Sequence, residues 1–393
     1  GGFLPAACLD RLPKEFDAWE AVASELPRLN RSGRLAARLE ALPQLDVANL
    51  KPEELRRAYV LLGSLAHSYV HRQAVPWHKL DDPTSGEDGR VPQHKARLPR
   101  QVSEPWLQVC QQLGMPPVLT AAGTDLWNWR LRDTSKPFEP ANLEQRITVT
   151  GSGSERVFHM VPCAMQAAAA EVVPKIFLAD VLVRKGRQDE LAALLLEVAD
   201  VLREFKRFFK QIATGVDPDI FYNVYRPLLN GFHPDGVTME VAKPWEGLEA
   251  VTGLSSLSSG AWLNQCKGPS AGQSTVILLL DALLAVPHAH AGAAFQEEML
   301  LYMPAEHRQM VLDFRARWKG LATIPEIVSK VGEDAAGLQQ AYNEAVTALG
   351  DLRRFHLATV RRYLVRTSKG TGATTWRKLL QAMLDTTAAS LLR

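Results

Sequence analysis

The sequence predicts an all-α protein, and three observations carry that prediction. Segments with apolar residues at helical spacing recur from near the first residue to the last. No stretch of alternating apolar and polar residues is long enough to predict a persuasive strand. No repeat of fixed period is present, which argues against a solenoid. The 393 residues, 46% hydrophobic and 22% charged, are sufficient for a large core and for two or three domains.

The helices expected early in the chain are short, with one exception. The strongest pattern begins at Pro52, which suits the first helical position, and places Glu53 and Glu54 in the first turn, where acidic groups are favoured. Prolines crowd the segment that follows this helix, so we expect a long irregular connection there. The expected helical segments are 16–26, 35–42, 52–70 and, after the connection over 72–105, 106–132 with a break at Pro116 and Pro117.

The rest of the chain is expected to be almost entirely helical. A Gly-Ser-Gly-Ser turn at 151–154 is a candidate joint between two parts of the fold. We therefore expect a small N-terminal helical domain, residues 1–140, and a larger helical-bundle domain, residues 141–393. The expected helices are 158–173, 188–214, 220–231, 274–286, 292–318, 333–365 and 375–392, the last after a small polar loop over 367–374.

Charge and cysteine usage exclude several classes of protein. The net charge of +2, with arginines interspersed among acids, gives no electrostatic footprint for nucleic acid. The four cysteines lie far apart without a CxxC pair, so a zinc site or redox dithiol is not expected, and a cytoplasmic location is the simplest account. The start of the chain does not resemble a signal peptide, and the longest apolar run, 276–286, is too short to span a membrane.

Candidate chemistry rests on a few isolated residues, because no GxSxG, P-loop or strand-linked GxGxxG motif is present. His356 lies on the apolar face of the expected helix 333–365, with Arg353 one turn earlier on the same side. A lone histidine in such a place is usually a hydrogen-bonded core residue. Arg226 stands among apolar neighbours and needs an anionic partner, either in the protein or in a ligand. His67 and His71, four residues apart, could chelate a metal on one helix face, although no third ligand is evident.

Seven ordered segments give the chain a resemblance to a known family. They are 98–100 (LPR), 115–119 (MPPVL), 221–226 (FYNVYR), 270–274 (SAGQS), 302–308 (YMPAEHR), 352–356 (LRRFH) and 369–372 (KGTG). Each segment is weak alone, but their joint order and spacing cover nearly the whole length. On these segments the chain resembles the indoleamine 2,3-dioxygenases, haem enzymes that open the indole ring of tryptophan.

The resemblance implies a haem b site in the larger domain, with the smaller domain over its distal side. His356 matches the proximal histidine that would bind the iron. Arg353 matches a residue near a haem propionate, and Asp281 matches its carboxylate partner, although the two could also form a purely structural ion pair. Ser270 matches a residue of the loop over the haem edge. The other expected partners are O₂ and an external electron donor that keeps the iron ferrous, with neither nucleic acid nor membrane involved.

The resemblance also implies a substrate pocket. Phe158 and Phe221 match distal aromatic walls that would hold an indole ring against bound oxygen and so count as catalytic, although both would also suit an ordinary core. Arg226 matches the residue that pairs with the substrate carboxylate, and it too is expected to be catalytic. The remaining substrate contacts expected from the resemblance are Thr124, Ala271 and Thr371, the last on a mobile loop.

The sequence departs from the mammalian pattern around this pocket. Pro162 stands where those enzymes carry a serine, and His159 stands where a second phenylalanine is common. The other departures are Ala121, Thr124, Asp125 and Asn230. These changes leave the matches to the iron ligand and the carboxylate clamp intact but put the preferred indole in doubt. We therefore expect a dioxygenase that converts L-tryptophan or a related indole to N-formylkynurenine or its analogue. A haem enzyme with another indole substrate and a non-catalytic haem-binding or sensing protein are the alternatives.

Overall fold

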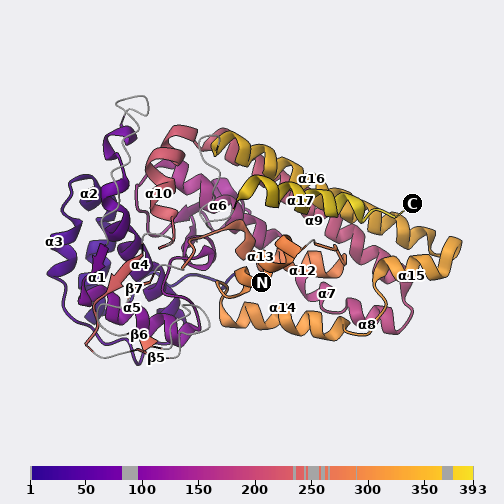
Figure 1. Ribbon diagram of the computed structural model, residues 1–393, viewed down its shortest axis with the longest axis horizontal. Coiled ribbons are helices and arrows are strands. Elements are labelled where there is room, and N and C mark those ends of the chain that lie inside the picture. The colour runs from indigo at the N-terminus through magenta and orange to yellow at the C-terminus, as the bar shows by residue number, and fades with distance from the viewer. Residues whose placement is uncertain are drawn as a thin grey trace.

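A computed structural model of the chain describes residues 2–81, 96–232, 236–242, 245–246, 256–257, 262–263, 266–288, 290–364 and 375–392. The molecule is elongated (Figure 1), with the N-terminal helices gathered at one end and long helices running away from them toward the other. Within the described part of the chain, the regular structure is helical apart from very short strands. The all-α prediction is therefore confirmed.

The N-terminal end is built around α4 (Pro52–His71), which is buried along most of its length. Lys51 donates its backbone N–H to the Glu54 carboxylate over 2.8 Å, which satisfies one of the free donors at the start of this helix. α4 packs against α5 (Arg100–Leu113) and α1 (Asp17–Ser24). The other elements are η1 (Lys14–Phe16), α2 (Leu26–Arg31), α3 (Leu35–Glu40), η2 (Arg72–Ala74), η3 (Trp77–Leu80), β1 (Ala96–Leu98), η4 (Ala122–Leu126), β2 (Trp129–Leu131), η5 (Pro140–Asn142) and β3 (Leu143–Gln145).

The long axis of the molecule is formed by α9 (Gln188–Gly215) and α16 (Ala336–Tyr363), each 28 residues long. α6 (Gly153–Ala168) packs on α9, and α17 (Trp376–Ala389) packs on α16 (Figure 1). The remaining helical elements are α7 (Val172–Ile176), α8 (Ala179–Arg184), η6 (Ile220–Tyr225), α10 (Arg226–Leu229), η7 (Ala271–Gln273), α12 (Thr275–Leu283), α13 (His290–Leu300), α14 (Ala305–Trp318), α15 (Ile324–Val331) and η8 (Gly332–Ala335).

The strands are two or three residues long and form small ladders. β1 pairs in parallel with β4 (Val237–Met239), which pairs antiparallel with β7 (Trp262–Leu263). β2 pairs with β3, and β5 (Trp245–Glu246) pairs with β6 (Ser256–Leu257), both antiparallel. Runs this short leave too little alternation to be found from sequence.

Several predicted boundaries differ from the structure for identifiable reasons. Residues 72–105 are not wholly irregular, because α5 begins at Arg100 and runs through Pro105. Residues 114–132 contain a π-helical turn and a strand instead of α-helix. The expected helix 292–318 is two helices, which the segment before Pro304 separates. None of the described helices is long and apolar enough to cross a membrane. The division into domains at residue 140 stays a prediction.

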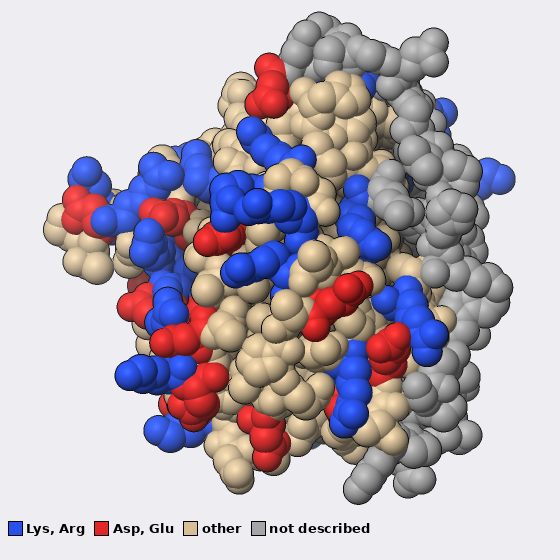
Figure 2. Space-filling view, turned by 90° about the vertical axis from the view of Figure 1, so that its left-hand side faces the viewer, with Lys and Arg blue, Asp and Glu red and all other residues tan. Residues whose placement is uncertain are grey.

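Charged side chains are mixed on the surface at the N-terminal end of the molecule. Figure 2 shows basic and acidic groups intermingled on this face. Arg11 pairs with Asp17 over 2.9 Å, and Arg31 with Asp81 over 3.2 Å. Pairs this exposed contribute little to stability.

Candidate active site

An internal cavity of about 290 Å³ lies where α6, α9, α16 and α17 meet the N-terminal end of the molecule. Most of its lining is aromatic or aliphatic, which favours a large planar apolar ligand. The lining includes Ala121, Thr124, Asp125, Phe158, His159, Pro162, Phe209, Phe221, Arg226, Ser270, Ala271, Phe295 and His356.

His356 lines this cavity from α16. Leu352, Leu357 and Tyr363 are buried on the same helix, so the apolar face predicted from sequence does turn inward. The imidazole stands edge-on to the ring of Phe209, with 5.6 Å between centroids. Burial, followed by the nearby charge of Arg353, lowers the pKa of His356 to about 4. The imidazole is therefore neutral at pH 7, as a metal ligand must be.

No hydrogen bond to the His356 ring is found among the described residues. This distinguishes it from His67, whose Nε2 accepts from the Leu119 N–H over 2.8 Å while Nδ1 lies 3.1 Å from the Leu228 carbonyl. His67 is thus a core histidine with both nitrogens in use, which leaves neither for the chelate considered with His71. His356 keeps its nitrogens for a ligand in the cavity.

Arg353 and Asp281 are brought together, as expected, in a buried network. Arg353 Nη2 donates to both Asp281 oxygens, over 2.7 and 2.6 Å. Asp281 also accepts from His288 Nε2 over 3.0 Å and from Gln296 Nε2 over 2.7 Å. Burial alone would raise the pKa of Asp281, but Arg353 and His288 outweigh it and hold the pKa below its usual value. Neither Arg353 nor Asp281 lines the cavity, so their expected contact with haem stays a prediction.

Phe158 and Phe221 form one wall of the cavity. Their ring centroids are 4.7 Å apart, and Phe221 also meets the edge of Tyr363 at 5.6 Å. Phe221 lies on η6, which is a π-helical turn, as is η4 on the neighbouring part of the wall. Wide turns of this kind occur mainly as short interruptions of helices and frequently at functional sites.

The remaining predicted substrate contacts lie around this wall. Arg226 is buried at the start of α10 and lines the cavity. Thr124 lines it from η4, and Ser270 and Ala271 line it from the loop before α12. Thr371 lies outside the described residues. Its expected role is therefore not tested.

The loop of Ser270 is shaped by two close contacts. The Ser270 hydroxyl accepts a hydrogen bond from the Gly272 N–H over 3.3 Å, which caps η7. A side chain at Gly272 would meet the ring of Phe295 at 2.5 Å, so only glycine fits there without displacing that ring. The loop is therefore packed directly against a residue of the cavity lining.

A polar cluster on the cavity wall was missed by the sequence reasoning. Asp125 and His159 were noted only as departures from a pattern, and Tyr225 only as part of the segment 221–226. In the structure His159 Nδ1 lies 2.5 Å from Asp125 Oδ1, and Nε2 is hydrogen-bonded to the Tyr225 hydroxyl. The signal in the sequence was a histidine within the otherwise apolar helix 158–173.

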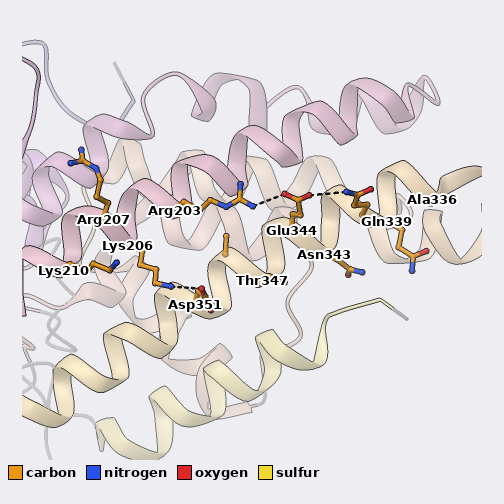
Figure 3. A pocket seen from close by; sticks show the side chains of 12 residues that line it. Arg203, Lys206, Arg207, Lys210, Ala336, Gln339, Asn343, Glu344, Thr347 and Asp351 are labelled. Carbon is orange, nitrogen blue, oxygen red and sulfur yellow. Dashed lines mark hydrogen bonds and ion pairs between the residues drawn. The ribbon is translucent and has the colours of Figure 1, made fainter.

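A second hollow, of about 790 Å³, is an open groove between α9 and α16. Figure 3 shows Arg203 directed to Glu344 and Lys206 directed to Asp351 across it, over 2.9 and 2.7 Å. Its lining is polar, and these basic groups already have acidic partners. The groove does not suit an apolar ring, whereas the internal cavity does.

Among the described residues, no group of three or more histidine, cysteine, aspartate or glutamate side chains could hold a bare metal ion. The internal cavity offers a different arrangement: both ring nitrogens of His159 are hydrogen-bonded to protein groups, whereas the neutral imidazole of His356 has no hydrogen bond among the described residues and faces a largely apolar lining. That donor set fits a metal carried in a macrocycle, which needs one axial protein ligand.

Comparison with known proteins decides the family. The family model described as indoleamine 2,3-dioxygenase matches residues 1–390. The chain belongs to the indoleamine 2,3-dioxygenase family. The resemblance drawn from the seven segments is thus confirmed, and the protein is a dioxygenase, an oxidoreductase.

Relatives in this family carry different names. Indoleamine 2,3-dioxygenase 1 of Rattus norvegicus is 30% identical over 100% of this chain and 93% of the rat protein. A 6-hydroxytryptophan 2,3-dioxygenase of Fusarium equiseti is 29% identical over 94% of this chain and 84% of the fungal protein. A protein named myoglobin from Haliotis madaka is 26% identical over 94% of this chain and 87% of its own length.

Proposed function

We propose that this dioxygenase is haem-dependent and adds both atoms of O₂ across the C2–C3 bond of L-tryptophan or a related indole. The product from tryptophan is N-formylkynurenine, at the start of the kynurenine pathway. The observation that carries the proposal is His356, a neutral imidazole that has no hydrogen-bond partner among the described residues and faces a largely apolar cavity. The names of the relatives support an indole substrate.

The residues present fit a haem b group held by His356. Phe209 sets the ring plane of the imidazole, and Ser270 and Ala271 would lie along the haem edge. Arg353, one turn from His356, is held in place by Asp281 and would be available near a propionate. When bound, ferrous haem supplies oxygen activation, and an external electron donor must keep the iron reduced.

The chain's own residues bind and orient the substrate. Phe158 and Phe221 would hold the indole ring in a slot from which water is excluded. Arg226 would pair with the substrate carboxylate, since a guanidinium can grip it through two hydrogen bonds. Thr124 and Ala271 would complete the pocket, with Thr371 closing over the amino-acid end. Fixing the reacting carbons in this way lowers the barrier by removing orientational freedom.

The domain roles follow as part of the same proposal. Residues 1–140 would cover the distal side of the haem, and residues 141–393 would hold it. A cytoplasmic location rests on the four cysteines, all of which are free thiols.

The test is a visible spectrum of the purified protein followed by an oxygen-uptake assay. We expect a Soret band typical of histidine-ligated haem, and tryptophan-dependent O₂ uptake with a product heavier by two oxygen atoms. His356→Ala should abolish stable haem loading, while His78→Ala, outside the cavity, should not. Normal haem spectra in His356→Ala would refute the ligand assignment. Absence of O₂ uptake with every indole would refute the reaction.

A non-catalytic haem protein is the second candidate, favoured by the relative named myoglobin. A carrier of this kind has no need of a carboxylate clamp. Arg226→Ala separates the two candidates, because it should raise the tryptophan requirement of an enzyme but leave the O₂ affinity of a carrier unchanged.

A further inference from the structure

The cavity wall contains a hydrogen-bonded chain of three residues from three elements. His159 lies on α6, Asp125 on the π-helical turn η4 and Tyr225 at the end of η6. The imidazole joins the carboxylate, 2.5 Å away, to the phenol. Asp125 and His159 both line the cavity, but His159 is 2% exposed with both ring nitrogens hydrogen-bonded, Tyr225 is 2% exposed, and the Asp125 side chain is 15% exposed. Asp125 is therefore the member of this hydrogen-bonded series that can contact a ligand.

The proton positions follow from Tyr225. Burial first, and then the charges of Glu155 and Asp125, raise the pKa of Tyr225 well above its usual value. The phenol keeps its proton and donates it to Nε2 of His159. The imidazole then carries its own proton on Nδ1 and donates it to Asp125 Oδ1. Each donor and acceptor in the series Tyr225–His159–Asp125 is thus assigned, and the Asp125 carboxylate is the last acceptor.

The second oxygen of Asp125 has no hydrogen bond among the described residues. Two carboxylates that are fully buried in this protein have donors on both oxygens. Glu155 accepts from the N–H groups of Val149 and Thr150, each over 2.8 Å, and Asp281 has partners on both oxygens. Asp125 is only partly buried, so water can reach its second oxygen while the cavity is empty. A bound ring that excludes water and offers no donor would leave this oxygen unsatisfied, which is costly. An acceptor on the wall of a largely apolar cavity therefore favours a ligand that supplies the donor.

The proposed function makes that ligand an indole, and an indole ring carries few hydrogen-bond donors. They are the pyrrole N–H and any hydroxyl on the benzene ring. A methyl group at the same position offers no donor and would leave the carboxylate unsatisfied. Such a site rejects the analogue that lacks the donor more strongly than an apolar pocket rejects an added methyl.

We propose that Asp125 selects the substrate by accepting a hydrogen bond from an N–H or O–H donor on its indole ring. His159 and Tyr225 are positioning residues that hold the carboxylate in the wall. This inference rests on the proposed function, in that it takes an indole as the ligand of the cavity. It adds a specificity determinant that the aromatic walls alone do not supply.

The experiment compares matched ligands that differ only in the donor. Haem-loaded protein is given L-tryptophan against 1-methyl-L-tryptophan, and 5- and 6-hydroxytryptophan against the corresponding methyltryptophans. kcat/KM is measured for each, and dissociation constants are measured by calorimetry. The N1 pair reports on the pyrrole N–H, and the other pairs report on ring hydroxyls. We expect at least one pair to show a preference for the donor of roughly 10- to 100-fold, the range of a hydrogen bond to a charged group.

Variants tie that preference to the carboxylate. In Asp125→Val, the ratio between the donor ligand and its methyl partner should fall to about threefold or less. Asp125→Asn, which is nearly isosteric, should also weaken the preference, and it serves as the test if the valine variant does not fold. Tyr225→Phe should lower the preference partly, because it removes the hydrogen bond that holds His159. Asp313→Asn, an exposed carboxylate change on α14, should leave it unchanged.

The proposal would be overturned if, for every ligand pair, both Asp125 variants showed the same preference for the donor ligand as wild type. A wild type that prefers none of the donor ligands would also overturn it. Calorimetry keeps this test separate from the proposed function, because binding is measured without turnover. A protein that oxidises no indole but binds donor ligands through Asp125 would refute the reaction and support the selection.

Discussion

Removal of Arg353 tests the buried network behind the candidate iron ligand. The Arg353 side chain donates two hydrogen bonds to Asp281, which is only 4% exposed. Arg353→Leu leaves a buried carboxylate with only His288 and Gln296 as partners. Loss of one partner from a buried pair costs about 3–5 kcal/mol. Because His288 and Gln296 still donate hydrogen bonds to Asp281, we expect the lower end, about 3 kcal/mol.

The double variant shows how much of that cost comes from the orphaned charge. Asp281→Asn removes the charge, so the combination Arg353→Leu with Asp281→Asn should be less destabilised than the sum of the single changes by about 2 kcal/mol. Urea unfolding of the haem-free protein at pH 7 gives the four free energies of unfolding that are needed, for wild type, the two single variants and the double variant. A cost below about 1 kcal/mol for Arg353→Leu alone, or strict additivity, would refute this account of the network.

Three further predictions concern separate parts of the molecule. Burial, followed by the charge of His71, lowers the pKa of His67 from 6.5 to about 3. Folding therefore favours the neutral imidazole, and His67 takes nothing from the free energy of unfolding above pH 6.5. As the pH falls from 6.5 toward 3, the unfolded chain binds a proton that the folded protein does not, and the free energy of unfolding decreases. Glutamine keeps a donor and an acceptor but does not titrate, so between pH 7 and pH 5 the free energy of unfolding of His67→Gln should fall by about 2 kcal/mol less than that of wild type. Urea unfolding at the two pH values measures this, and an equal fall in both proteins would contradict it. Gly272→Ala should push the ring of Phe295 aside, cost about 1–3 kcal/mol in thermal unfolding and weaken haem retention; an unchanged melting temperature would show that the loop adapts freely. Arg226→Ala should lower kcat/KM for tryptophan by roughly 100-fold but much less for 3-methylindole, which has no carboxylate, and equal losses would argue against a carboxylate clamp.

The long helices could be predicted because their periodicity is strong. α4, α9 and α16 lie within a few residues of the expected bounds, since α9 and α16 each bury one apolar face and α4 is buried on nearly all sides after its first turn. The start of α5 was missed because prolines were taken as helix breakers, although the helix continues through Pro105. η4 and η6 could not be recognised, because a π-helical turn does not follow the 3.6-residue period used to find helices.

The candidate site was only partly predictable for a different reason. Periodicity placed His356 on an inner face, and the resemblance to a family singled it out from other buried histidines. The chain from Asp125 through His159 to Tyr225 joins residues 34 and 66 positions apart. No local spacing links such residues, so only the packing of three elements reveals that they act together.

The two sides of the cavity differ in how readily they can change during evolution. The candidate iron ligand lies within one uninterrupted 28-residue helix, α16, where an inserted or deleted residue would rotate every following side chain by about 100°. The opposite wall is carried by η4 and η6, two wide turns that already accommodate an extra residue. Small insertions there can redirect Asp125 or Phe221 and leave the long helices undisturbed. Descendants of one ancestral fold can therefore acquire new ring preferences while they keep the same axial ligand.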